Sequence, residues 1–520
     1  MTSDYPKPPC SKSIIFFNHW CALTILVIAG ALQTLTFAPF FLWWLGPVSV
    51  LLILLVTVPL APEKLFKAGW FTGLGLFGSG ASWVYISISE YGNTDTLIAI
   101  LLTALFVAGL ALFHGLAFWF WGKLARHSAI RRLILFPAIW ILGDWLRGWL
   151  LTGFPWLYLG TAHTDGPLAG LAPLVGVHGI TLWIAITGAA IYGIWWLVTG
   201  LRYGAAALVA ALALAPWLAA PAMNQLAWTR ISSEPVSFAA MQGNISQHIK
   251  WDAEFLKDQI VTYLGMTKDD WDTDLILWPE TAIPIPQDQA GEIIDYISQQ
   301  LGEHSTLITG IPWYGFSDRT ESFTYHNSIV AIGDAEGIYH KQKLVPFGEY
   351  VPLQGALRGL IGFFDLPMSS FSPGPENQGP LTASGLKVMP FVCYEVAYPD
   401  FVAVNSRGAD LLLTISNDGW FGDSIGPVQH LQLARMRALE TGRYMLRGTN
   451  NGVTAIINNK GEITETIPHF EKAVLHGNVY AAKGSTPYMQ TGSWPVLTLA
   501  AMLIVFVRER VIPPVSASGS

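Results

Sequence analysis

The sequence predicts an α-helical integral membrane domain with eight transmembrane helices, joined to a layered α/β domain. The 520 residues are 52% hydrophobic and only 12% charged, with a mean hydropathy of +0.41, whereas soluble domains average about 25% charged residues. Long apolar runs fill the first 222 residues and return once near the end. Between them, charges return and short apolar runs alternate with amphipathic segments, which is typical of an α/β domain.

The apolar regions divide into candidate membrane spans. A spanning helix needs about 20 apolar residues, and seven N-terminal runs approach this length: 18–36, 41–60, 66–88, 96–122, 132–151, 173–199 and 204–221. We therefore predict a transmembrane domain of seven helices, an α/β domain, an eighth transmembrane helix and a disordered tail, over residues 1–222, 223–490, 491–510 and 511–520.

Lysine and arginine in the short loops predict the orientation in the membrane, because cytoplasmic loops carry an excess of them. They occur at both ends of the chain and in every second loop: Lys7, Lys12, Lys64, Lys67, Lys123, Arg126, Arg131, Arg132, Arg202, Arg508 and Arg510. The loops at 37–41 and 88–96 have none. We expect both termini in the cytoplasm and the α/β domain on the opposite side, which is the periplasm in a bacterium with two membranes.

One ionisable pair lies within a predicted span. Asp144 and Arg147 are three residues apart, on one face of the helix. Charged groups at membrane depth are costly and usually paired. We expect a helix-internal ion pair near the outer interface, the alternative being a contact with lipid headgroups.

The α/β domain is predicted to contain alternating strands and helices. Short apolar runs bounded by polar residues, Gly or Pro predict buried strands at 238–242, 274–279, 305–311, 326–333, 387–393, 409–416 and 452–458. Apolar residues at three-and-four spacing predict helices at 252–268, 290–303 and 428–443.

Three polar residues follow predicted strands or precede a turn: Glu280 in "LILWPETAIP", Lys341 in "GIYHKQKLVPFGEYVP" and Cys393 in "VMPFVCYEV". Reactive groups of α/β sheets lie at the carboxyl ends of strands. Cys393 is either a buried apolar filler or an attacking thiolate. In the second case Glu280 would take its proton. Lys341 would favour both ionised partners and stabilise an oxyanion.

These motifs resemble a known family. "WPE", "YHKQKLVPFGE" and "CYE", in this order, are similar to the Glu–Lys–Cys triad of the nitrilase (carbon–nitrogen hydrolase) superfamily. The multi-span N-terminus, "QGNISQHIKW", "FFDLPMSSFSPG", "SNDGWFGDSIGP" and "QHLQLARMRALETGR" resemble the apolipoprotein N-acyltransferase family over essentially the whole chain. The resemblance implies a nitrilase-like αββα sandwich carried on eight transmembrane helices in a bacterial inner membrane, acting as a monomer.

The resemblance also implies a reaction. An acyl chain would pass from a phospholipid, typically the sn-1 chain of phosphatidylethanolamine, to a Cys393 thioester. It would then pass to the N-terminal amine of the S-diacylglyceryl cysteine of an apolipoprotein, in a ping-pong mechanism. One alternative is a membrane-tethered nitrilase-type amidase that releases acyl groups to water, and another is a transporter with a solute-binding domain. We expect no metal, nucleotide or nucleic-acid partner, because no ligand spacing, phosphate loop or basic tract occurs.

The resemblance assigns supporting roles to further residues. Glu349 would orient Lys341 or relay a proton, and Glu395 would support the active site. Trp251 and Asn327 would support the pocket, with core packing as the alternative. Tyr394 would contribute the backbone N–H that follows the nucleophile, a plausible oxyanion donor.

The helix predicted at 428–443 carries other polar residues. Arg437 and Glu440 lie three residues apart and are expected to form a surface pair. His430 is expected to be a hydrogen-bonded helix histidine without a catalytic role.

The loop at 357–368 groups apolar side chains next to the active-site turns, including Leu360, Phe363 and Phe364. Large exposed apolar patches mark membrane or partner contact. This loop is expected to be a mobile lid that enters the outer leaflet, with core packing as the alternative.

Overall fold

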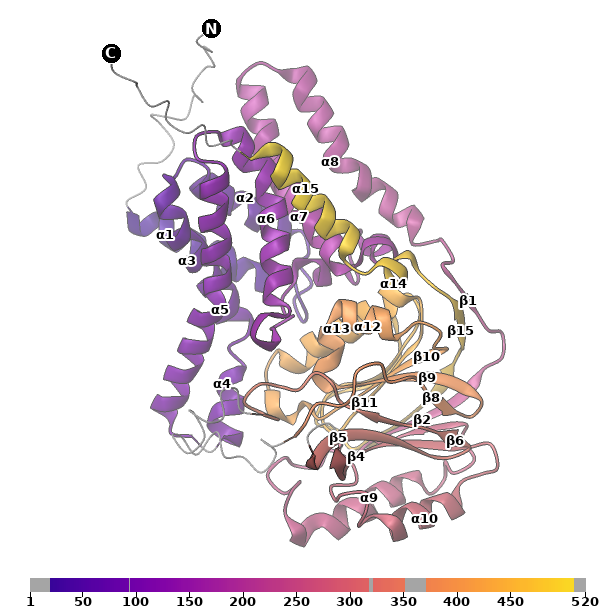
Figure 1. Ribbon diagram of the computed structural model, residues 1–520. Helices are drawn as coiled ribbons and strands as arrows, with labels where there is room; N and C mark the ends of the chain where they lie inside the picture. Colours follow the sequence, from indigo (N-terminus) through magenta and orange to yellow (C-terminus); the bar gives the residue numbers. More distant parts are fainter. Residues whose placement is uncertain (1–18, 93, 318–320, 351–370, 509–520) are drawn as a thin grey trace, which may run out of the picture.

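The molecule has a helical half and a half built around β-sheets (Figure 1). The structure is a computed structural model that describes residues 19–92, 94–317, 321–350 and 371–508. The predicted lid residues Leu360, Phe363 and Phe364 lie outside these ranges.

Each of the eight apolar runs contains one helix. The helices are α1 (His19–Thr34), α2 (Leu45–Thr57), α3 (Leu65–Gly80), α5 (Thr96–Leu124), α6 (Ala129–Arg147), α7 (Ala172–Thr199), α8 (Tyr203–Met223) and α15 (Trp494–Val507). Among the described residues, three helical segments are long and apolar enough to cross a membrane: Thr96–Leu124, Ala169–Thr199 and Tyr203–Met223. Eight crossings, their orientation and the domain boundaries therefore stay predictions.

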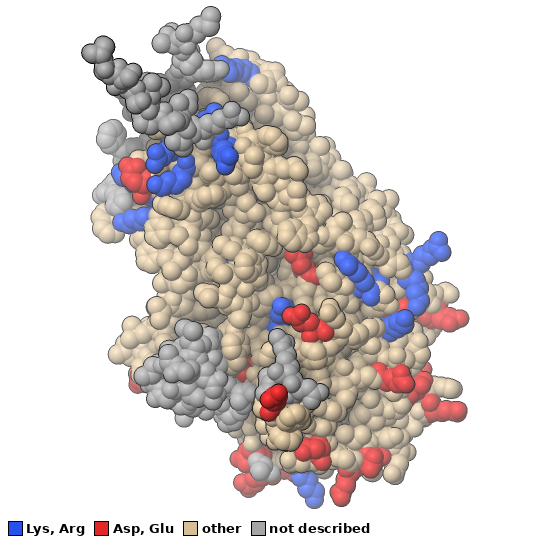
Figure 2. All heavy atoms as spheres, in the orientation of Figure 1, with Lys and Arg blue, Asp and Glu red and all other residues tan. Residues whose placement is uncertain are grey.

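The surface agrees with a lipid environment for the helical half. On the face shown in Figure 2, charged side chains gather at the far end of the helices and around the α/β domain, and a broad band between them carries almost none. Many large apolar side chains on α5 and α8 are exposed, among them Leu105, Leu116, Leu208 and Leu218. A soluble protein seldom exposes so large an apolar surface.

Helix α3 lies between its neighbours α1 and α5, and small residues allow the contact. A Cβ atom at Gly75 would collide with the carbonyl oxygen of Val27 on α1, and one at Gly69 with that of His114 on α5. Close backbone approach through glycine is the usual way for membrane helices to pack.

Two sheets form the centre of the α/β domain. The six-stranded sheet has the order β14-β2-β3-β4-β5-β7, with bounds Ala473–Val479, Val236–Gln242, Leu275–Leu277, Thr306–Ser317, Ser322–Gly333 and Ile338–His340. The seven-stranded sheet has the order β13-β12-β11-β10-β9-β8-β6, with bounds Ile463–Ile467, Thr454–Ile457, Met445–Thr449, Leu411–Ser416, Leu386–Val392, Leu381–Ala383 and Ala335–Glu336. All seven predicted strands are confirmed, whereas β6, β7, β8, β11, β13 and β14 were not predicted.

Helices cover the outer faces of both sheets. Helices α9 (Leu256–Thr267) and α10 (Gly291–Gln300) lie under the six-stranded sheet, and α12 (Pro399–Asn405) and α13 (Gly426–Thr441) cover the seven-stranded one (Figure 1). Apolar residues of the two sheets, such as Leu277 and Phe391, share one buried cluster between them. The predicted αββα layering is confirmed.

Helix α13 lies between the two halves, and all of its residues except Val428 are buried. Its apolar residues Met436 and Leu439 belong to a cluster formed mainly by helices of the N-terminal half. Arg437 Nε lies 3.0 Å from Glu440 Oε2, with both side chains 1% exposed. The prediction of a surface pair is therefore wrong, since a second layer of helices covers the face that would otherwise meet solvent.

The ion pair predicted within α6 is confirmed. Arg147 Nη2 lies 2.9 Å from Asp144 Oδ1, and both side chains are buried. The guanidinium also donates to the carbonyl oxygens of Phe154 (2.6 Å) and Trp156 (2.7 Å). Arg147 thus holds the loop that follows α6 against the helix.

Replacing Arg147 should destabilise the protein strongly. An R147M protein leaves the Asp144 carboxylate buried without its cation, which costs about 3–5 kcal/mol. We expect a clearly lower Tm in detergent, measured by circular dichroism. The control is K268M, because Lys268 pairs with Asp269 at 3.7 Å on the surface, where such pairs contribute little. Equal Tm values for the two variants would contradict this assignment.

Candidate active site

Three predicted residues come together where strands of the two sheets end. Glu280 follows β3 by three residues, Lys341 directly follows β7, and Cys393 directly follows β9. Glu280 is 8% and Lys341 1% exposed, and Cys393 is half-buried. The site therefore has little contact with water.

Lys341 lies between two carboxylates. Its Nζ is 2.9 Å from Glu349 Oε1 and 2.8 Å from Glu349 Oε2. It is 3.7 Å from Glu280 Oε1. Asn327 Nδ2 donates to Glu280 Oε1 (2.7 Å) and to Glu349 Oε1 (2.9 Å). Lys341 and Asn327 thus hold the two acids side by side.

The remaining carboxylate oxygens are also bonded. Glu280 Oε2 accepts from the backbone N–H of Asn417 at 2.8 Å, and Glu349 Oε2 accepts from that of Val345 at 2.8 Å. Burial alone would lower the pKa of Lys341, but the charges of Glu349 and Glu280 outweigh it and raise the pKa above its ordinary value. Lys341 is therefore an ammonium at every physiological pH.

Cys393 opens a tight turn, η9 (Cys393–Ala397), with a left-handed φ of 54°. Its Sγ accepts a hydrogen bond from Ser416 Oγ at 3.4 Å. Burial, followed by the charge of Glu280, raises the pKa of the thiol to about 12, although Lys341 opposes this. The raised pKa favours a thiol in the resting site. A base must take its proton during attack, and the Glu280 carboxylate is suited to that role.

Glu395 links the segment of Lys341 to the segment of Cys393. Its fully buried carboxylate accepts from the Tyr339 hydroxyl (3.0 Å) and from the backbone N–H groups of Gln342 (2.7 Å), Lys343 (3.1 Å) and Val392 (2.7 Å). The first three donors belong to or follow β7, and the last ends β9. The carboxylate thus ties the two strand ends together.

A second polar network behind Cys393 was missed by sequence reasoning. Asp418 accepts from Ser416 Oγ and from Arg447 Nη2, the latter at 2.6 Å. His430 Nδ1 lies 2.9 Å from Asp418 Oδ1, and His430 Nε2 lies 3.0 Å from the carbonyl oxygen of Cys393. His430 is therefore a hydrogen-bonded helix histidine, as predicted. The one available signal was the run of polar residues in "SNDGWFG" after a buried strand.

The same network contains residue types that bind metals. Ligand atoms of Cys393, Asp418 and His430 lie within 4.8 Å of one another, the one such group among the described residues. However, the Arg447 guanidinium already occupies the Asp418 carboxylate. Burial alone would raise the pKa of Asp418, and Arg447 and His430 hold it well below its usual range. This cation and its bonds do not fit a metal site.

Tyr394 connects the nucleophile to the helical half. Its ring stacks on Trp156 with centroids 6.4 Å apart, and its hydroxyl donates to the carbonyl oxygen of Gly153 at 3.2 Å. Trp251 is half-buried and follows Lys250, whose Nζ donates to the backbone oxygen of Glu280 at 2.8 Å. Among the supporting residues, Asn327, Glu349 and Glu395 thus touch the triad or its strand ends directly.

Comparisons with known proteins cover both halves. Residues 29–190 match the family profile described as "Apolipoprotein N-acyltransferase N-terminal domain", and residues 237–485 match "Carbon-nitrogen hydrolase". The chain is 47% identical to an apolipoprotein N-acyltransferase of Pseudomonas syringae pv. tomato, over 93% of this chain and 96% of that protein. It is 39% identical to one of Coxiella burnetii, over 93% and 98%.

Among solved structures, Nit3 of Saccharomyces cerevisiae, titled a member of the nitrilase superfamily, matches with a TM-score of 0.35 and 16% identity. The match covers 51% of this chain and 95% of that chain.

Glu395 offers a direct test of how the site is held together. In an E395Q protein, an amide NH₂ would face at least one of the donors that the carboxylate now accepts from. A buried, unsatisfied donor costs about 1–3 kcal/mol, so we expect a lower Tm and slower alkylation of Cys393. The control is E465Q, because Glu465 is exposed on β13. If E395Q and E465Q have the same Tm, the linking role of Glu395 is wrong.

Proposed function

Because the chain belongs to the apolipoprotein N-acyltransferase family, we propose that it acylates lipoproteins from a phospholipid donor through a thioester on Cys393. Membership of the family makes it an acyltransferase of lipoprotein maturation. The donor, the intermediate and the residue roles are part of the proposal. The observation that carries them is the buried cluster of Glu280, Lys341 and Glu349 around the half-buried Cys393.

The first half-reaction would begin with the thiol of Cys393. As the sulfur attacks the ester carbonyl of a phospholipid, the sn-1 ester of phosphatidylethanolamine by the family resemblance, Glu280 takes the thiol proton. Lys341 and the backbone N–H of Tyr394 would stabilise the oxyanion. When the carbon–oxygen bond breaks, the leaving lysophospholipid takes the proton from Glu280. The acyl chain stays on sulfur.

The second half-reaction would release the acyl chain to an amine. The neutral α-amino group of an S-diacylglyceryl cysteine attacks the thioester, and Glu280 accepts the proton that the nitrogen loses. The carbon–sulfur bond breaks, and Glu280 returns the proton to the sulfur of Cys393. A thioester reacts with amines more readily than an ester does, so the covalent intermediate divides one difficult step into two easier ones.

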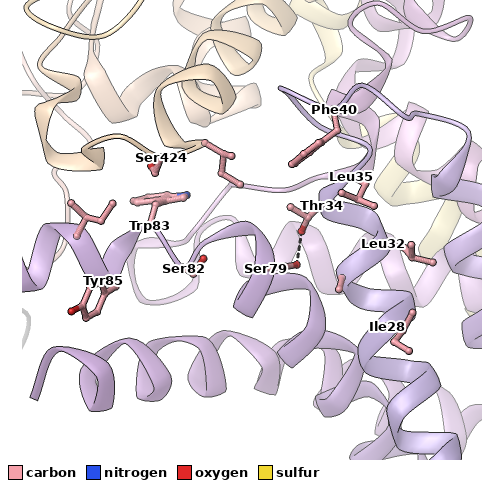
Figure 3. A pocket seen from close by; sticks show the side chains of 13 residues that line it. Ile28, Leu32, Thr34, Leu35, Phe40, Ser79, Ser82, Trp83, Tyr85 and Ser424 are labelled. Carbon is pink, nitrogen blue, oxygen red and sulfur yellow. Dashed lines mark hydrogen bonds between the residues drawn. The ribbon is translucent and has the colours of Figure 1, made fainter. Parts of the chain in front are cut away.

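An apolar hollow supports the approach of a lipid from the helical half. Its volume is about 840 Å³, and it lies between α1, the segment from α3 to α4 (Val84–Ile86) and the turn before α13 (Figure 3). Side chains lining it include Ile28, Leu32, Phe40, Trp83 and Ile425.

The wall of this hollow leads towards the nucleophile. The ring of Trp83 contacts that of Phe421, with centroids 4.6 Å apart, and that of Trp156 at 5.5 Å. Trp156 in turn stacks on Tyr394, the residue after Cys393. A continuous series of aromatic rings thus runs from the wall of the hollow to the residue next to Cys393.

The proposal includes the setting of the reaction. We place the α/β domain in the periplasm of a bacterial inner membrane, with both termini in the cytoplasm and the protein acting as a monomer. The positions of Lys and Arg in alternate loops support this orientation. The buried site supports transfer over release to water, because water at a thioester would hydrolyse it.

A labelling experiment distinguishes the acyltransferase from an amidase that releases fatty acid. The purified protein is incubated with acyl-labelled phosphatidylethanolamine and a diacylated lipopeptide, and the products are separated. We expect label on the amine of the peptide, and none with C393A, which lacks the nucleophile. The matched control C21A should keep full activity, because Cys21 lies exposed on α1. Label recovered solely as free fatty acid would support the amidase instead.

A further inference from the structure

A second buried lysine faces the active site. Lys250 is 3% exposed and lies in the segment between β2 and α9. Its Nζ donates to the backbone oxygen of Glu280 at 2.8 Å. On α9, Gln259 Nε2 donates to the carbonyl oxygens of Ile249 and Lys250, both at 3.1 Å. The backbone of Lys250 is thus fixed so that its side chain points to the base of the predicted triad.

The charges of the site explain why a second cation belongs there. Glu280 and Glu349 carry two negative charges, and Lys341 between them carries one positive charge. Together these three groups leave one net negative charge in a buried place. A buried charge without compensation is costly. A net negative charge also makes it harder for the thiol of Cys393 to ionise. One further ammonium makes the resting cluster neutral.

We propose that Lys250 is the second cation of the active site, which neutralises the Glu280–Lys341–Glu349 cluster so that Cys393 can ionise when Glu280 takes its proton. Lys250 is a positioning residue, since it acts through Glu280 and through its charge. The inference rests on the proposed role of Cys393 as nucleophile.

The charge of Lys250 depends on pH within the physiological range. Burial lowers the pKa of Lys250 to about 8, although the charge of Glu280 and, once it ionises, that of Cys393 oppose this. Lys250 is therefore charged below about pH 8 and loses its charge as the pH rises through that value. Lys250 therefore stabilises the ionised sulfur of Cys393 below about pH 8, and this stabilisation is lost above that pH. Lys341, with its raised pKa, cannot produce a change at this pH.

Alkylation of Cys393 tests this without any acyl donor. The full-length protein in detergent is treated with iodoacetamide between about pH 6 and pH 9, and the peptide containing Cys393 is followed by mass spectrometry. The sulfur displaces iodide while its proton passes to Glu280. For the unsubstituted protein we expect the rate to rise with pH as the thiol ionises, and to rise less steeply near pH 8, where Lys250 loses its charge and the pKa of the thiol increases.

Two substitutions separate the charge of Lys250 from its structural role. K250M should react about tenfold more slowly at neutral pH, the effect of one unit in the pKa of the thiol, and its rate should rise with an unchanged slope through pH 8. K250R keeps a permanent charge, so it should stay near the original rate at neutral pH and also show an unchanged slope. The control K257M, on the exposed face of α9, should keep the original profile.

The inference is overturned if K250M keeps the change of slope near pH 8, if it reacts as fast as the original protein, or if K250R is as slow as K250M. The last result would mean that the bond geometry of lysine matters and its charge does not. Because alkylation needs no lipid, failure of lipid-to-peptide transfer would remove the proposed function and leave this result standing.

Discussion

The structure depends on placing several anions in one buried site. Glu280 and Glu349 share Lys341 and Asn327 between them, and Cys393 must ionise beside them. Burial makes that ionisation difficult, as the raised pKa of the thiol shows. The same burial would keep water from the proposed acyl intermediate. The buried anions are stabilised by lysine ammoniums, an amide and backbone N–H groups. These groups come from different parts of the chain.

The second constraint is the joint between the site and the helical half. Polar side chains of α13 make this joint by bonding backbone and side-chain groups of the helical half. Gln432 accepts from the N–H of Ala38, Gln429 from the indole of Trp156, and Glu440 from the N–H of Val177. Arg447 and His430 extend the same layer to the carbonyl oxygen of Cys393. The nucleophile is thus held by contacts that also hold the two halves together.

Local patterns in the sequence predicted seven strands, a layered α/β domain and the candidate residues Glu280, Lys341 and Cys393, while the family resemblance implied the αββα order of the layers. These patterns failed where the burial of a residue depends on a segment distant in the chain. Arg437 and Glu440 have the three-residue spacing of a surface ion pair, yet helices of the N-terminal half, distant in the chain, cover them. Strand β11 was not predicted because it contains Arg447, whose burial depends on Asp418 from another segment. Lys250 was not singled out from the sequence, because only the folded chain places it beside Glu280.

The most direct measurement is mass spectrometry of the full-length protein after exposure to phospholipid vesicles, followed by addition of a diacylated lipopeptide. The account predicts one acyl group on the peptide that contains Cys393, which disappears when the lipopeptide is added and never forms in E280Q. An acyl group on another side chain, such as Ser416, or lipopeptide acylation by a protein whose Cys393 never carries one, would contradict it.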